Sequence, residues 1–127
     1  MNELIAFVHV PAQRSKQAAY LKVTTGAVDD WPALGIAVMI VNDANVIESA
    51  RIVACAATEK ATRLTSAEAV LKGNRIDDKL LRRAADAAVE EVEFLSDMRG
   101  SAPYKRELMR VYVQRAIRAA LDESRGR

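Results

Sequence analysis

The sequence predicts an α+β fold, in which three helices pack on one face of an antiparallel sheet of three to four strands. Up to about Cys55 the apolar segments are short, β-branched and separated by turn residues, whereas beyond it apolar residues recur at helical spacing. Strands followed by helices are typical of such a two-layer sandwich. We expect one domain over residues 1–122 and a frayed tail at residues 123–127.

Four segments of the first half are predicted as strands. Residues 4–10 are apolar and end at a proline, which cannot donate to a sheet hydrogen-bond ladder. Residues 18–25 alternate between apolar and polar side chains, as a half-buried strand does. Residues 34–41 are almost continuously apolar, which favours a central strand covered on both faces. Asn and Asp at 42–45 favour a hairpin turn into the last strand, at 46–56.

The first two helices are marked by their end signals. Thr65 and Glu68 have the spacing of a capping box, in which each side chain bonds the other residue's backbone N–H. Gly73 is a natural C-terminal stop for this short helix. Carboxylates at Asp77–Asp78 favour the N-terminus of the second helix. One face of that helix is then apolar, at Leu81, Ala84, Ala85, Ala88 and Val92.

The third helix is predicted to start at Ser101 and Pro103, because proline fits a first helical turn. An apolar stripe follows, made of Leu108, Met109, Tyr112, Val113, Ala116 and Ala120. Basic residues gather on the same helix, at Lys105, Arg106, Arg110, Arg115 and Arg118. Acidic residues interrupt them and the net charge is only +2, so a solvent-exposed face is favoured over a nucleic-acid interface.

Few residues offer chemistry. His9, the only histidine, lies in a predicted strand, where a structural role is favoured over that of a base or ligand. Cys55 is the only cysteine, so we expect a buried, inert thiol and no internal disulfide. This inventory nearly excludes a zinc or iron–sulfur site made by this chain alone. Asp29–Asp30 and Asp77–Asp78 are better explained by a turn and by helix capping than by acid–base catalysis.

Enzyme and membrane functions are made less favoured by the absence of the sequence motifs that they usually need. The sequence has no glycine-rich phosphate loop and no nucleophile elbow, so no catalysis is expected from this chain alone. No apolar run approaches the length of a membrane span, and the N-terminus lacks the pattern of a signal peptide. We therefore expect a cytoplasmic protein that contacts neither membranes nor nucleic acids.

One stretch carries a specific resemblance. Residues 96–108 resemble the closing segment of the FAD-binding medium subunit of molybdenum hydroxylases, the family of carbon monoxide dehydrogenase and xanthine dehydrogenase. The family pattern Asp-x-Arg-(Ala/Gly)-Ser-x-x-Tyr-(Arg/Lys) is matched by Asp97, Arg99, Gly100, Ser101, Tyr104 and Lys105. Further segments resemble the family's C-terminal domain in the same order, namely residues 3–11, 20–22, 30–32, 50–52 and 68–73.

The resemblance implies an α+β domain with a structural or assembly role in a molybdenum–iron–sulfur–flavin oxidoreductase. The glycine-rich loops that hold most of the FAD in the family are not in this sequence. FAD is therefore expected only through a partner chain or domain, and none on the isolated chain. Lys22 and Arg63 are the candidates for a peripheral FAD contact. The implied partners are an FAD-binding domain or subunit and the other subunits of the complex.

The sequence also departs from the family pattern near the expected flavin. A Gly-Gly pair and a Pro-Thr-Pro turn are usual there, whereas this chain has Cys55-Ala56 and Glu59-Lys60-Ala61. Side chains in place of glycine add bulk and restrict positive φ angles. This departure favours an alternative, a non-catalytic interaction or homo-oligomerisation module derived from the same domain.

Overall fold

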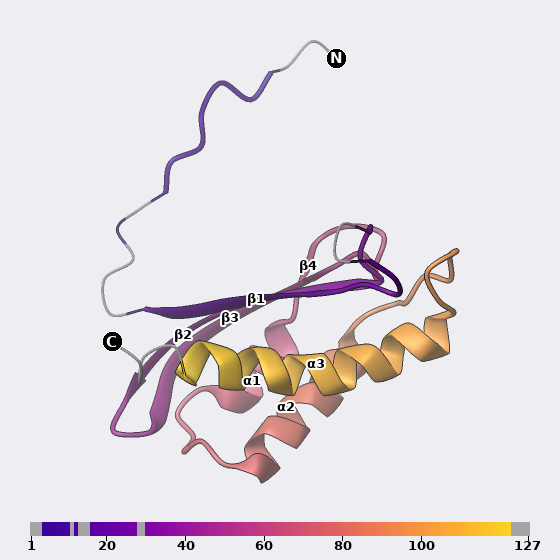
Figure 1. Cartoon of the computed structure of the whole chain (residues 1–127). Coiled ribbons are helices and arrows are strands. Elements are labelled where there is room, and N and C mark those ends of the chain that lie inside the picture. Colours follow the sequence, from indigo (N-terminus) through magenta and orange to yellow (C-terminus); the bar gives the residue numbers. More distant parts are fainter. Residues whose placement is uncertain (1–3, 11, 13–15, 28–29, 123–127) are drawn as a thin grey trace.

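Four strands and three helices form two layers in the computed structural model, which describes residues 4–10, 12, 16–27 and 30–122. The strands are β1 (Gln17–Val23), β2 (Leu34–Asp43), β3 (Val46–Cys55) and β4 (Thr62–Arg63). The helices are α1 (Thr65–Leu71), α2 (Asp78–Glu91) and α3 (Ala102–Asp122). The sheet is antiparallel in the order β1-β2-β3-β4, and all three helices lie on one side of it (Figure 1). The predicted fold class is confirmed.

The first predicted strand is wrong. Residues 4–10 have no regular secondary structure and are exposed, and they run away from the sheet in Figure 1. The fourth strand is instead the short β4, which pairs with Val53 and Ala54 and was not predicted. A strand needs a neighbour for its N–H and C=O groups, and no pairing among the described residues involves the N-terminal segment. Pro11, its predicted end, lies outside the described residues.

The other three strands begin and end within two residues of their predicted limits. Ala44 and Asn45 turn the β2–β3 hairpin with φ angles of 43° and 72°, which matches the two left-handed residues of a type I′ turn. The prediction that β2 is covered on both faces is wrong. Ile36, Val38 and Ile40 are buried against the helices, but the alternate residues remain partly exposed.

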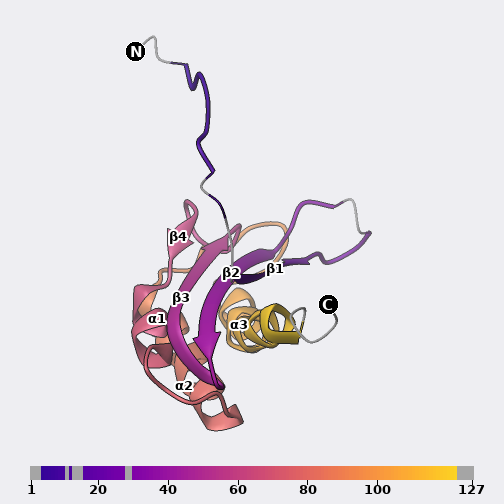
Figure 2. The same cartoon turned by 90° about the vertical axis from the view of Figure 1, so that its left-hand side faces the viewer.

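The core lies between the sheet and the helices. The sheet supplies Leu34, Ile36, Ile40, Ile47 and Ile52, all fully buried. The helices supply Leu71, Leu81, Val89, Met109 and Ile117. Figure 2 shows the sheet curving over the helix layer, with α3 beneath β1 and β2 and α1 beneath β3. Helix α2 packs on α1 and α3 and closes the layer.

The helix starts test three of the predicted end signals. Asp77 caps α2 as predicted, since its carboxylate accepts a 2.6 Å hydrogen bond from Leu80 N. Ser101 precedes α3 and accepts from Tyr104 N through its hydroxyl at 3.3 Å. The capping box of α1 is wrong, because Leu64 occupies the N-cap position and cannot cap with its side chain, and the free N–H of Ser66 donates instead to Glu91 of α2 at 2.9 Å. The side chain of Glu68 is used elsewhere, as described below.

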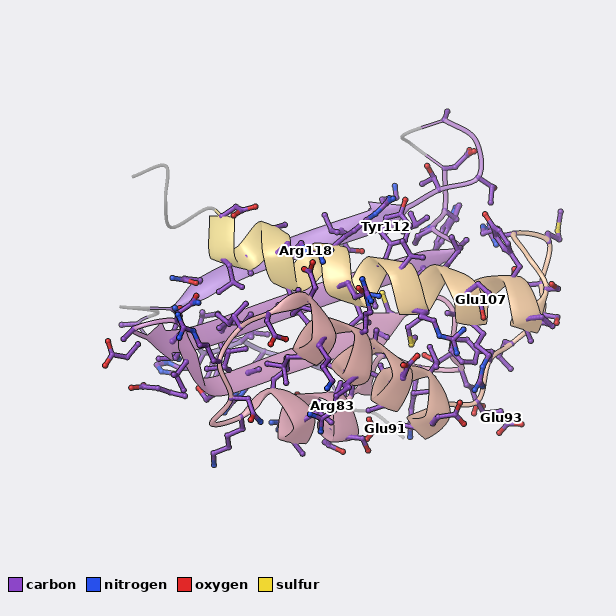
Figure 3. All side chains as sticks on the ribbon, turned by 90° about the horizontal axis from the view of Figure 1, so that it is seen from below. Arg83, Glu91, Glu93, Glu107, Tyr112 and Arg118 are labelled. Carbon is purple, nitrogen blue, oxygen red and sulfur yellow. The ribbon has the colours of Figure 1, made fainter. Side chains whose placement is uncertain are left out.

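Ion pairs join the outer faces of α2 and α3, which Figure 3 shows from the helix side. Arg106 pairs with Glu90, Arg110 with Asp86 and Glu107, and Arg118 with Asp78. Three of the basic residues of α3 are thus paired with acidic neighbours, as on a solvent-exposed face of mixed charge, and Arg115 lies over the ring of Tyr112. Lys105 is the exception, because it is fully buried. Its predicted place on the exposed basic face is wrong.

Candidate functional site

The sheet face opposite the helices has no covering layer among the described residues, and we call it the open face. Alternate residues of the strands lie on it: Ala18, Tyr20, Lys22, Gly35, Ala37, Met39, Arg51, Val53, Cys55 and Arg63. Lys22 is opposite Gly35, and Arg63 is opposite Val53. The structure therefore places both predicted cofactor-contact residues on one face, on opposite edge strands, three strand spacings or about 14 Å apart across the sheet and two residues apart along it.

The centre of the open face is apolar and slightly hollow. A shallow hollow of about 450 Å³ lies over β1, β2 and β3, lined mainly by Ala18, Tyr20, Ala37, Met39, Arg51 and Val53. The alanine side chains leave this space because they end at Cβ, while the larger side chains stand around it. Lys22, Arg51 and Arg63 add positive charge around the apolar centre. A flat apolar group with negative charge at its edge would be complementary to such a surface.

Tyr20 and Cys55 meet above Gly35. A side-chain Cβ at Gly35 would lie 2.7 Å from the Tyr20 hydroxyl and 2.6 Å from the Cys55 sulfur. Partial burial, and then the charge and hydrogen bond of Cys55, raise the pKa of Tyr20. Cys55 is partly exposed, so the expectation of a buried thiol is wrong. The absent side chain of Gly35 allows two polar groups to close this end of the hollow.

Arg63 is anchored at the edge of the open face by Glu68 of α1. Its guanidinium donates to both carboxylate oxygens, with Nε at 2.9 Å from Oε1 and a terminal nitrogen at 2.7 Å from Oε2. Glu68 Oε1 also accepts from Ile52 N at 2.9 Å. Burial raises the pKa of Glu68, but hydrogen bonds from Arg63 and Ile52 outweigh burial, and the pKa is lowered overall. The predicted capping box assigned Glu68 to the helix start and missed its bonds to Ile52 and Arg63. The available signal was the position of a carboxylate between apolar residues of a short helix.

Two of the family-signature residues, Asp97 and Lys105, form a hydrogen-bond network that connects two loops, and we call it the Lys105 network. Lys105 Nζ, fully buried, donates to Asp97 Oδ2 at 2.7 Å and to the Ala56 carbonyl at 3.1 Å. The other carboxylate oxygen of Asp97 accepts from Arg99 N at 2.8 Å. The Lys105 network thereby connects the first turn of α3 to the loop that follows β3.

Two other signature positions shape the same turn. Gly100 has a φ of +154°, and a Cβ there would lie 2.5 Å from the ring of Tyr104. Arg99 stacks on the exposed ring of Trp31, with its guanidinium carbon 5.9 Å from the ring centroid. The geometry thus gives this turn an architectural role, and Lys105 links it to Ala56, the residue that follows Cys55 of the open face.

The loop after β3 carries backbone strain at Ala56, one of the two positions where the sequence departs from the family pattern it resembles. Ala56 has a φ of +67°, a left-handed conformation that costs a residue with a Cβ about 1 kcal/mol or more. The loop is held there by the Lys105 bond and by Leu95 N, which donates to the Ala57 carbonyl at 3.0 Å. The fold therefore holds Ala56 in a conformation that glycine adopts without steric cost.

Ala56→Gly is expected to raise the free energy of unfolding by about 0.5–1 kcal/mol, because glycine reaches positive φ without steric cost. Urea unfolding of the full chain measures it. Ala57→Gly is the matched control, since Ala57 is buried and lacks a positive φ. The control should lose stability. Loss of stability in both variants would contradict the strain assigned to Ala56.

Neither a metal site nor a membrane-spanning helix is found among the described residues. No group of three or more His, Cys, Asp or Glu side chains there could hold a metal ion. None of the described helices is long and apolar enough to cross a bilayer. The open face and the adjoining signature turn remain the candidate site.

Comparison with known proteins gives this geometry a context. Residues 19–120 match the family model of the CO dehydrogenase flavoprotein C-terminal domain. The carbon monoxide dehydrogenase medium chain of Hydrogenophaga pseudoflava is 33% identical over 122 residues, covering 94% of this chain and 42% of the relative. The glyceraldehyde dehydrogenase medium chain of Sulfolobus acidocaldarius is 27% identical, with 92% and 41% covered.

Solved structures of related enzymes have the same fold as this chain. A carbon monoxide dehydrogenase from Hydrogenophaga pseudoflava, lacking the Mo-pyranopterin moiety of its cofactor, matches with a TM-score of 0.81 and 31% identity over 86% of this chain and 38% of the other. Quinoline 2-oxidoreductase from Pseudomonas putida 86 matches with a TM-score of 0.78 and 25% identity, with 85% and 38% covered. The chain thus spans about two fifths of the length of the curated relatives.

Proposed function

We propose that this chain, which belongs to the CO dehydrogenase flavoprotein C-terminal domain family, completes the medium subunit of a molybdenum–iron–sulfur–flavin oxidoreductase. In this proposal the main FAD site is on another chain or domain, and this chain has a structural and assembly role. The open face is the observation that carries the proposal, because an exposed apolar sheet face surrounded by cationic side chains is typical of a surface that binds a partner or a ligand.

The residues of the open face fit one side of a flavin ring better than a whole FAD. Ala18, Ala37 and Val53 offer an apolar surface for a flat ring, and Lys22 offers a positive charge at its edge. The pyrophosphate has no counterpart, because the chain lacks a glycine-rich loop. We therefore assign a supporting wall to this chain and the phosphate contacts to its partner.

The chain's own residues would act through position and charge. FAD, when bound, supplies reversible electron transfer. Lys22 would favour negative charge developing beside the open face. Two nitrogens of Arg63 already bond Glu68, so its guanidinium would act from a fixed position at the edge of the open face. Ala37 and Val53 would exclude water from the covered surface.

The alternative function is an interaction or oligomerisation module without a flavin. It is favoured by one observation, the methyl group of Ala56 in a loop where the family usually has glycine. Under this alternative the open face would be covered by a second copy or by a protein without cofactor. The two proposals differ in what accompanies the chain from its native cells.

The test is recovery of the full chain from its native cells, followed by a visible spectrum and molybdenum analysis of the complex. We expect flavin and molybdenum to travel with the chain. Lys22→Met should lower the flavin content, because it removes a cation from the open face, whereas Lys79→Met on α2 should not. A colourless complex without molybdenum would refute the proposal, as would stoichiometric FAD binding by the isolated chain.

A further inference from the structure

A second hollow, of about 490 Å³, lies at the outer edge of β3, between that strand and α1. Helix α1 packs on β3, and Figure 2 shows the two elements side by side. Three cationic side chains, Arg51, Arg63 and Lys72, line this hollow, which we call the edge pocket. Glu68 is the single acidic residue among the described residues of its lining. The edge pocket therefore has an excess of two positive charges.

The carboxylate of the edge pocket is already bonded within the fold. Glu68 accepts hydrogen bonds from Arg63 at 2.9 Å and 2.7 Å, and from Ile52 N at 2.9 Å. Its charge is therefore balanced by Arg63, and the two-pronged contact fixes the guanidinium in one orientation. Arg63 is thus a preorganised cation at one wall of the pocket.

The other two cations, Arg51 and Lys72, are exposed, and neither forms an ion pair with any described residue. The charge of Arg51 contributes to the lowered pKa of Glu68, so its guanidinium lies near the same end of the pocket. Like charges that share a pocket without acidic partners repel one another. A bound anion would remove this repulsion.

The main chain of β3 adds a hydrogen-bond donor to the edge pocket. At Ile52 the outer edge of the strand is occupied, because the N–H donates to Glu68 and the carbonyl accepts from Leu64 N at 2.8 Å. Ala50, two residues earlier, directs its N–H to the same edge, since the direction of this group alternates along an antiparallel strand. No described residue bonds this N–H, and Ala50 lines the pocket. A backbone donor therefore accompanies the three cations.

We propose that the edge pocket binds a phosphate group, either as the free ion or as the ester of a small polar molecule. A phosphate with a charge near −2 matches the excess of two positive charges, whereas a single carboxylate would leave one cation unbalanced. Guanidinium groups bind phosphate oxygens with two parallel hydrogen bonds, and a lysine ammonium binds them as a point charge. The site goes beyond the proposed function, because it lies at the strand edge outside the hollow of the open face, although Arg51 borders both.

The lining also limits the molecule to which the phosphate is attached. No aromatic side chain is present among the described residues of the edge pocket, so a nucleoside base or a flavin ring has no stacking partner there. The remaining lining is small or polar and includes Ser49 and Thr65. The Thr65 hydroxyl already donates to Glu91 at 2.5 Å, which leaves the Ser49 hydroxyl as a donor for a sugar or polyol. Glycerol phosphate is therefore a suitable probe of an ester.

Calorimetric titration of the full chain with inorganic phosphate, in a phosphate-free buffer of low ionic strength, tests the site. We expect saturable binding at a single site. Arg51→Gln and Lys72→Gln should each weaken it at least about tenfold, because each removes a charge-assisted hydrogen bond. Both side chains are exposed, so the melting temperatures should equal that of the wild type. Arg83→Gln on α2 is the matched control, because it removes the same charge from an exposed position outside the pocket, and it should leave the affinity unchanged.

Binding without saturation, or equal weakening by Arg83→Gln, would overturn the proposal, because the attraction would then come from net charge alone. Succinate that competes with phosphate at equal affinity would also overturn it and would assign the pocket to carboxylates. Glycerol phosphate distinguishes the two sources of the phosphate group: tighter binding than that of inorganic phosphate indicates an ester, and equal or weaker binding indicates the free ion. All of these results leave the proposed function standing, because flavin and molybdenum in the native complex are measured separately.

Discussion

Lys105→Ala is expected to lower the free energy of unfolding by about 2–4 kcal/mol, measured by urea unfolding of the full chain. The substitution removes a fully buried side chain and leaves a cavity at the start of α3. It also takes the hydrogen-bond donor from the Ala56 carbonyl, which Lys105 Nζ reaches at 3.1 Å. The loop after β3 would lose its link to the signature turn.

Lys105→Met is the control for volume, because it keeps most of the apolar stem without the ammonium. We expect a smaller loss, about 1–2 kcal/mol, from the unsatisfied carbonyl. If Lys105→Ala has the free energy of unfolding of the wild type, the Lys105 network does not stabilise the fold.

The pH dependence of the same pair gives an independent check. Asp97 has a pKa below its ordinary 3.8, mainly because Lys105 donates a hydrogen bond to its carboxylate. A folded-state pKa below the unfolded one contributes stability that is full above the unfolded pKa and lost as pH falls through the folded value. The stability difference between wild type and Lys105→Met should therefore be constant near neutrality and narrow below about pH 4.

Glu68→Ala is expected to destabilise the chain by about 2–3 kcal/mol. The carboxylate is nearly buried and accepts from Ile52 N at 2.9 Å, where β3 extends past the short β4. Alanine would leave that backbone N–H without an acceptor. It would also release the guanidinium of Arg63 from the sheet edge. Urea unfolding measures the loss.

Glu68→Gln separates the two roles of Glu68. Its amide oxygen can still accept from Ile52 N, so the loss of stability should be smaller than with alanine. The charge partner of Arg63 is removed in both variants. If the two variants lose equal stability, the bond to Ile52 contributes nothing measurable and our interpretation of the edge is wrong.

The predictable part of the fold was the part governed by local pattern. The hairpin residues 42–45, the stop at Gly73 and the Asp77 cap depend on neighbours within a few positions, and the structure has each of them. The capping box at Thr65 failed although its spacing was right. Glu68 found better donors at Ile52 and Arg63, which are near it only after the chain folds.

The candidate site was partly accessible to sequence reasoning. Alternation along β1 put Tyr20 and Lys22 on one side of a strand, but nothing in the sequence said that Arg63 shares that side. The register of three strand pairs decides it. Lys105 looked like one of several exposed basic residues, and its burial depends on Asp97 and Ala56, the latter 49 positions away.

The sequence by itself determined the fold class, the starts of the helices and the family, because hydrophobic period, turn chemistry and signature residues are local properties of the chain. The tertiary structure alone decided which surfaces stay uncovered. Strand formation at residues 4–10 and cover for the open face both depend on a neighbouring surface, and no described part of this chain supplies one. A strand forms its hydrogen bonds, and an apolar face is buried, only where a second surface lies against it. Strand formation at residues 4–10 and burial of the open face therefore depend on a contact that the sequence pattern does not specify.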